Sequence, residues 1–466
     1  MRKNIVFAVL ILTLIGFVQL TAQINSNAFL EKDINQIFQS PEAVDSSYLT
    51  QMEFILSDPD NKILYGLDIF GAFKNSAVSP YQVYNDRFHY LVSPFGHYKF
   101  NDQVTLDVRG NIENKKDDLV YAERAYWSDE LAGHYGGFEI AKITYNSDHF
   151  FVKYGRDYFL QGKYFYENLL FSKYNYPYDQ LVYGLKNDYF ELSSYYLSLN
   201  SLRENNDINI RHLNGHRLSV NLQIGYLAFN EVILYGGENR QINLALFNPL
   251  LIYYSYQKNA RNFESNSLVS AELYLYYRDY FFFGEFLLDD FQIDKDVPDD
   301  LEPTEWGMNV TIGKNKLIEN LNWKLNYTRV ANRTYNAPIK DYEKFVYKNY
   351  PIGHFFGNNF WEIKSSLTYI PSEKLWMELT LSHLEYGDEA LYSPFNKDYL
   401  NYTVEEGYSE SFPFGDVDIL TGLQFSGFYN LLNDLALNIN LGYYSENQLL
   451  KDNITFGAGF CYRFQN

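Results

Sequence analysis

Two long segments of the chain, 332–359 and 386–416, combine aromatic rings with carboxylates and amides. Segment 386–416 holds seven Asp and Glu residues against one lysine, Lys397, and its aromatic residues are interleaved with them. Sugar rings stack their C–H faces on aromatic planes, and sugar hydroxyls form hydrogen bonds with amides and carboxylates. The pattern therefore predicts polysaccharide binding, and the alternative is that the rings only pack these segments together. The candidate binding rings are Tyr335, Tyr342, Tyr392, Tyr399 and Tyr402.

Charged residues also occur inside segments of alternating apolar residues. Arg217 has the opposite parity to Leu218 and Val220, so it leaves a pleated sheet on the other face from them. We expect Glu231, on the next predicted strand, to face the same way as Arg217. In a closed sheet such charges point into the lumen, where pairing with one another is a commoner role than ligand binding. The other charges placed this way are Lys153, Lys324, Glu285, Asp289 and Arg463.

No spacing joins nucleophiles, acids and bases into a catalytic set. The eight histidines are scattered, and neighbouring carboxylates such as Asp289-Asp290 leave a strand on opposite faces. His212 and His216 are close in sequence, but metal sites depend on larger ligand clusters. The single cysteine, Cys461, cannot form an internal disulfide. We expect no catalytic residues, no metal and no cofactor, and a hydrolase using His216 is the less favoured alternative.

The strands that position these residues are clearest at the end of the chain. In segment 453–464, the even-numbered residues from Ile454 to Phe464 are mostly apolar or aromatic, and the odd-numbered residues are small or polar. Segment 435–444 is divided in the same way, with Leu437 and Ile439 on one face and Asn438 and Asn440 on the other. This period-two pattern indicates strands that separate two solvents. A transmembrane antiparallel β-barrel, which has hydrocarbon outside and water inside, meets that requirement.

The composition supports a barrel. Aromatic residues make up 19% of the chain, yet the mean hydropathy is −0.33. Aromatic girdles, a polar lumen and polar loops account for both values. No segment after the N-terminus approaches the run of about eighteen apolar residues that a membrane-spanning helix needs. The formal net charge of −20 argues against a nucleic-acid partner.

The N-terminal part divides into two segments. Arg2 and Lys3 precede the apolar run 5–18, and Ala22 offers a small residue for cleavage, so residues 1–22 form a predicted secretory signal peptide. Residues 23–60 have apolar residues at helical spacing and are predicted to be a mostly helical periplasmic segment, with a disordered leader as the alternative. Residues 61–466 then form the barrel. The predicted location is the outer membrane of a Gram-negative bacterium.

We predict about eighteen strands, an even number as in single-chain bacterial barrels. Turn-forming segments such as 101–103 and 146–148 fall at every second connection, and the longer segments fall at the others. Apolar residues on both faces between 113 and 190 leave a sixteen-strand alternative open. The predicted strands are 63–73, 88–99, 104–113, 137–145, 149–156, 180–187, 189–200, 216–227, 231–238, 266–277, 279–289, 305–313, 321–331, 360–370, 375–385, 417–429, 435–444 and 453–464.

Several ordered motifs between residues 150 and 360 resemble the Wzi-type capsule assembly family of outer-membrane proteins. Segment 155–162, which includes Arg156, is followed at 168–177 by a Leu-x-x-Ser-x-x-x-x-Pro pattern. The family often has Trp-Gly where this chain has Gln161-Gly162. Further motifs in the family's order lie at 214–218, 229–236, 246–250, 283–290 and 326–330.

The resemblance implies an eighteen-stranded outer-membrane barrel with a helical periplasmic element. It also implies a lectin-like function in holding capsular or related polysaccharide at the cell surface, without catalysis. The main alternative is a porin or solute transport channel. We expect a monomer surrounded by outer-membrane lipid. Because the loops are acidic, an acidic glycan would require bridging divalent cations.

Overall fold

The computed structural model describes residues 62–74, 88–113, 135–173, 175–204, 207–259, 263–290, 301–372, 374–388, 391–432, 434–445 and 454–465. The predicted signal peptide and the predicted periplasmic segment lie outside these residues. Among the helices of the described ranges, none is long and apolar enough to cross a membrane.

Nineteen strands pair in one sheet, and setting aside the three-residue β8 (Leu202–Glu204) leaves eighteen that form the wall of a closed antiparallel barrel. The wall strands are β1 (Ile63–Lys74), β2 (Phe88–Lys99), β3 (Val104–Glu113), β4 (Tyr135–Asn146), β5 (Phe150–Asp157), β6 (Tyr178–Lys186), β7 (Phe190–Ser198), β9 (Asp207–Leu222), β10 (Gly225–Glu238), β11 (Ser265–Tyr277), β12 (Tyr280–Asp290), β13 (Glu305–Ile318), β14 (Leu321–Val330), β17 (Phe360–Ser372), β18 (Leu375–Gly387), β19 (Val417–Leu432), β20 (Leu435–Tyr444) and β21 (Ile454–Gln465).

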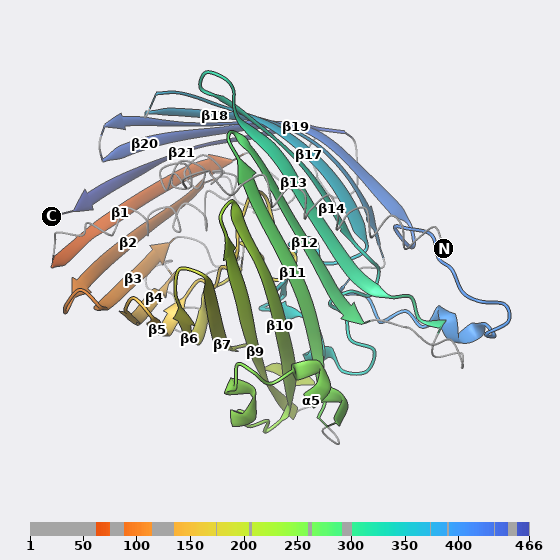
Figure 1. The fold of residues 1–466 in the computed structure, drawn as a ribbon. Coiled ribbons are helices and arrows are strands. Elements are labelled where there is room, and N and C mark those ends of the chain that lie inside the picture. Colours follow the sequence, from red (N-terminus) through yellow and green to blue (C-terminus); the bar gives the residue numbers. More distant parts are fainter. Residues whose placement is uncertain are drawn as a thin grey trace.

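The first and last strands close the ring. β1 pairs with β21 from Gly66 opposite Gln465 to Lys74 opposite Gly457, and Figure 1 shows the red β1 beside the dark-blue β21. The prediction of eighteen strands is confirmed and the sixteen-strand alternative is wrong. The remaining elements lie in connections: β15 (Val346–Tyr347), β16 (Tyr350–Pro351), α5 (Tyr253–Asn259), η1 (Leu244–Phe247), η3 (Asp341–Glu343) and η4 (Asp398–Asn401).

The two faces of the wall meet different surroundings. On β14 the burial alternates strictly: Asn322, Lys324 and Asn326 are buried on the lumen side, and the residues between them are partly exposed on the outside. Large apolar residues such as Leu381 and Leu437 are exposed on the outer face of other strands. A closed sheet that is apolar outside and polar inside satisfies every backbone group within hydrocarbon. The prediction of a transmembrane barrel is thus confirmed.

The sequence misplaced one turn. The predicted strands 216–227 and 231–238 are β9 and β10, and the chain reverses between Leu222 and Gly225. Gly225 has φ 149°, and a Cβ there would lie 1.8 Å from the carbonyl oxygen of Tyr274. Apolar alternation continues through this tight turn, so the pattern carries no break at the right place.

A buried ion-pair cluster ties the ring closure together. The Asp68 carboxylate on β1 accepts hydrogen bonds from Arg463 on β21, at 2.8 and 3.0 Å, and from Arg109 on β3, at 2.6 Å. The three side chains are between 2% and 9% exposed. Arg463 faces the lumen as predicted, and its partner belongs to the strand at the other end of the barrel sequence.

We expect Asp68→Asn to destabilise the folded barrel by about 3–5 kcal/mol, because two buried guanidinium groups lose their counter-charge. The free energy of unfolding can be measured in urea, with the heat-modifiable gel mobility of the folded barrel as readout. The control is Asp179→Asn, which breaks an ion pair with Arg156 in which the Asp179 side chain is 59% exposed. The control should change stability by about 1 kcal/mol or less. Equal effects of the two substitutions would contradict the assignment.

Candidate functional site

The connection between β5 and β6, residues 158–177, enters the barrel; we call it the lumen loop. At one wall, the Tyr158 hydroxyl donates to Glu139 on β4. At the opposite wall, Lys324 on β14 donates to the Phe165 carbonyl at 3.3 Å. Because β4 and β14 are nine positions apart in the ring of eighteen, the lumen loop crosses the whole diameter.

Lumen-facing charges hold this loop in place. The Glu285 carboxylate accepts hydrogen bonds from the backbone N–H groups of Leu169 and Leu170, at 2.7 and 3.1 Å. Arg217 pairs with Glu272 at 2.9 Å on the same side of the barrel. Arg217 and Glu285 therefore lie in the lumen, as the parity of their strands predicts. Glu272, which the sequence analysis did not single out, is the ion-pair partner of Arg217 among these lumen charges.

A second connection, residues 331–359, packs on the lumen loop. Asp289 accepts a hydrogen bond from the Tyr335 N–H at 2.6 Å, and the Tyr335 hydroxyl donates to the Leu169 carbonyl at 2.6 Å. The two connections share a hydrophobic cluster that reaches inward-facing residues of strands from β6 to β20, among them Val182 and Tyr444. The upper lumen is filled by this packing.

Glu231, which was predicted to face the lumen, faces outward instead. Glu231 lies opposite His216 on β9, whereas Asn230 lies opposite the inward-facing Arg217. The prediction for Glu231 was wrong because the turn between β9 and β10 was misplaced. An odd shift in the pairing of two strands turns every side chain of the second strand to the opposite face of the sheet. Arg156 also faces outward and forms a two-pronged ion pair with Asp179, at 2.6 and 2.9 Å.

The five tyrosines proposed for polysaccharide binding have different surroundings. Tyr335, Tyr342 and Tyr399 are 5% exposed or less, and they pack the loops. Tyr392 and Tyr402 are 58% and 44% exposed. Tyr392 and Tyr402 offer exposed rings to a ligand, whereas the three buried tyrosines support the loops on which these two rings lie. Their role in binding stays a prediction.

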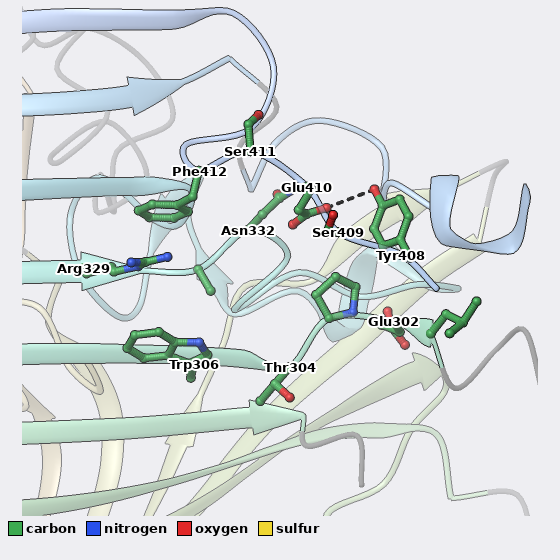
Figure 2. A pocket seen from close by; sticks show the side chains of 13 residues that line it. Glu302, Thr304, Trp306, Arg329, Asn332, Tyr408, Ser409, Glu410, Ser411 and Phe412 are labelled. Carbon is green, nitrogen blue, oxygen red and sulfur yellow. Dashed lines mark hydrogen bonds between the residues drawn. The ribbon is translucent and has the colours of Figure 1, made fainter. Parts of the chain in front are cut away.

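The structure brings together a pocket that the sequence did not indicate. It has a volume of about 260 Å³ and is formed by the connection 301–304, the outer ends of β13 and β14, residues 331–332 and the loop 408–412. All of these lie at the end of the barrel where the long connections are. Figure 2 shows Arg329 between the rings of Trp306 and Phe412, with Glu410 and Tyr408 across the opening.

The groups that line the pocket suit a polar ligand that has one apolar face. The Arg329 guanidinium carbon lies 3.8 Å from the centroid of the Phe412 ring and 5.3 Å from that of Trp306. Nε of Arg329 and Nδ2 of Asn332 are buried and have no hydrogen-bond partner among the described residues. Two unused donors beside two rings make a site for an oxygen-rich ligand.

Two carboxylates complete the pocket. Glu410 accepts hydrogen bonds from Arg333, at 2.9 Å, and from the Tyr408 hydroxyl, at 3.1 Å. Burial, followed by the nearby charge of Asp290, raises the pKa of Glu302 to about 7, although Arg333 opposes this shift. Glu302 therefore changes its charge near neutral pH.

Sequence reasoning found only parts of this pocket. Phe412 and Glu410 lie in the aromatic and acidic segment 386–416, and Arg329 lies in the family-like motif 326–330. Trp306 carried no signal beyond its place at the start of a strand. Among the described residues, no group of three or more His, Cys, Asp or Glu side chains is placed to hold a metal ion.

A closed barrel of eighteen strands, apolar outside and with a polar lumen, is the architecture of outer-membrane proteins of Gram-negative bacteria. The protein is therefore an outer-membrane β-barrel.

Among solved structures, the chain is similar to Wzi of Escherichia coli, described as an outer membrane protein involved in group 1 capsule assembly and a carbohydrate-binding β-barrel. The identity is 13%, the TM-score is 0.61, and the match covers 91% of this chain and 89% of that chain. OccAB4 of Acinetobacter baumannii matches at 10% identity with a TM-score of 0.49, covering 87% and 99% of the two chains. OpdK of Pseudomonas aeruginosa matches at 10% identity with a TM-score of 0.48 and the same coverage. No protein-family model and no curated protein matches the chain.

Proposed function

We propose that this protein binds capsular or related surface polysaccharide at the outer rim of its barrel. The observation that carries the proposal is the rim pocket, in which the Trp306 and Phe412 rings flank the Arg329 guanidinium, and Arg329 and Asn332 each have a buried donor without a partner among the described residues. Aromatic planes beside hydrogen-bonding groups suit a sugar ring. The carbohydrate-binding barrel of similar fold supports the same function.

The cationic group in the pocket defines the class of sugar. Arg329 makes no ion pair among the described residues, and its guanidinium lies over the rings of Trp306 and Phe412. A sugar carboxylate would give it the charged partner that a planar guanidinium binds best. The proposed ligand is therefore a polysaccharide that carries uronic acid or another acidic sugar. This arrangement needs no bridging cation.

The filled lumen supports a binding function over a diffusion pore. A barrel of this strand number leaves a water channel only where nothing occupies its interior. Here the lumen loop is held at both walls, through Glu139 at one and through Glu285 and Lys324 at the other.

The direct test is binding of the purified, detergent-solubilised protein to polysaccharide isolated from the source cells. We expect retention of the acidic polysaccharide, unchanged by a chelator of divalent cations. Cells that lack the protein should release polysaccharide into the medium. Absence of retention, together with normal attachment in those cells, would overturn the proposal. Loss of binding on chelation would indicate that a divalent cation, and not Arg329, holds the sugar carboxylate.

We expect binding of an acidic polysaccharide to weaken several-fold as the pH rises from about 6 to about 8. Glu302, with its pKa raised to about 7, is neutral at the lower pH and carries a negative charge at the higher pH. The sugar carboxylate is charged throughout, so repulsion appears only as Glu302 ionises. Glu302→Gln should bind equally at both pH values. An unchanged pH dependence in this variant would exclude Glu302 as its source.

A further inference from the structure

The connection between β10 and β11 folds onto the outside of the barrel, where α5 lies beside the ends of these strands (Figure 1). We call its described residues, 239–259 and Phe263, the outer flap. Leu246 and Tyr253 of the flap form a buried cluster with Ile233 and Tyr235, which are outward-facing residues of β10. The flap therefore occupies the side of the wall that lipid covers elsewhere.

The outer flap covers polar groups that would otherwise face the membrane. The Glu231 carboxylate accepts hydrogen bonds from the N–H groups of Tyr253 and Tyr254, at 2.9 and 2.7 Å. His216 lies 3.3 Å from the same carboxylate. On β6, which is separated from β9 by β7, the Tyr183 hydroxyl donates to the Phe247 carbonyl. Flap backbone thus satisfies outward polar groups, as hydrocarbon surroundings require.

The register of the sheet places these contacts at the level of the apolar belt. Glu231 lies opposite Val269 on β11, and Val269 lies opposite Leu288 on β12. Val269 is 39% exposed on the outer face, and so is Phe229 at 50%, two residues from Glu231 towards the short turn. The start of α5 therefore sits beside wall residues that contact lipid.

The outer side of the flap is itself apolar. Ile242, Leu244, Leu250 and Ile252 are 47%, 80%, 78% and 63% exposed. Charged residues lie only at its two ends: Arg240 follows the end of β10, and Lys258 is in the last turn of α5, next to the start of β11. Apolar side chains along the element, with basic side chains at its two ends, are typical of an element that lies at a lipid interface.

We propose that the outer flap is embedded in the outer leaflet of the membrane, with its four exposed aliphatic side chains among lipid acyl chains. The lipid-facing belt of β10 and β11 continues directly into this surface, which identifies hydrocarbon as its occupant. The flap is then a lipid-binding element of the barrel, separate from the pocket. It seals the Glu231–His216 pair from the bilayer.

The test uses a nitroxide spin label at Leu250→Cys, and separately at Ile252→Cys, in the full protein reconstituted into phospholipid vesicles. The native Cys461 is buried, so the unsubstituted protein serves as the labelling blank. Thr403→Cys, in the exposed loop 386–416, is the water-facing reference. We expect the ratio of oxygen to nickel-chelate accessibility to be several-fold higher at positions 250 and 252 than at position 403.

Heat-modifiable gel mobility confirms that each labelled variant is folded. Nickel accessibility at position 250 equal to that at position 403 would place the flap in water and overturn the proposal. Spin–spin broadening or disulfide cross-linking between two copies labelled at position 250 would also overturn it, because a second protein molecule would then cover the surface.

Discussion

Replacing residues 160–175 of the lumen loop by a short Gly-Ser linker is expected to turn a barrel that passes little current into an open channel. Asp157 and Tyr178 lie directly opposite each other on β5 and β6, so a short linker joins the shortened ends without strain. The deletion removes the lumen contacts of Phe165, Leu169 and Leu170. We expect a rise of roughly tenfold or more in single-channel current in planar bilayers, because the deletion clears the part of the lumen that this loop crosses and a barrel of this size with an open interior holds a water channel.

A matched substitution separates loss of the loop from loss of one contact. Tyr166→Phe keeps the ring and removes the hydroxyl, which forms a hydrogen bond with Ser366 at 2.7 Å, and should leave the current low. The intact protein is itself informative, since a large steady current through it would show that the loop does not close the lumen. Heat-modifiable mobility establishes whether the deletion variant remains folded.

The double substitution Trp306→Ala and Phe412→Ala is expected to abolish most binding of the acidic polysaccharide. Truncating a central aromatic contact typically costs about 2 kcal/mol or more, which is roughly a thirtyfold loss of affinity. Both rings also hold the Arg329 guanidinium in place. The affinity can be measured by calorimetry or by retention on immobilised polysaccharide.

Two further variants define what the pocket recognises. Arg329→Gln keeps the rings and removes the charge, so it should weaken binding of an acidic polysaccharide and leave a neutral one unaffected. Tyr392→Ala tests the competing site, because Tyr392 is an exposed candidate ring on the same acidic segment and does not line the pocket. If Tyr392→Ala were the more harmful change, the binding surface would lie on the exposed loop tyrosines instead.

The sequence alone determined the wall of the barrel. Alternation such as that of Asn438 and Asn440 with Leu437 and Ile439 is a local property, because successive side chains of a strand always leave on opposite faces. It predicts both the strands and their solvents wherever one face is apolar. It failed at Gly225, where the apolar pattern continues through a tight turn, and the error reversed the predicted face of Glu231.

Only the tertiary structure decided what the connections do. The pocket joins Glu302, Trp306, Arg329 and Glu410, which come from three parts of the chain, and no spacing in the sequence relates them. The lumen loop and the outer flap are similar connections by composition, yet one enters the barrel and the other lies on its outside. The position of the lumen loop depends on contacts between residues far apart in sequence, such as Leu169 with Glu285, whereas the outer flap is held by Glu231 on the strand that precedes it. The contacts of the lumen loop and of the pocket form only when distant strands come together, because closure of the ring is what brings those strands to a common lumen and rim.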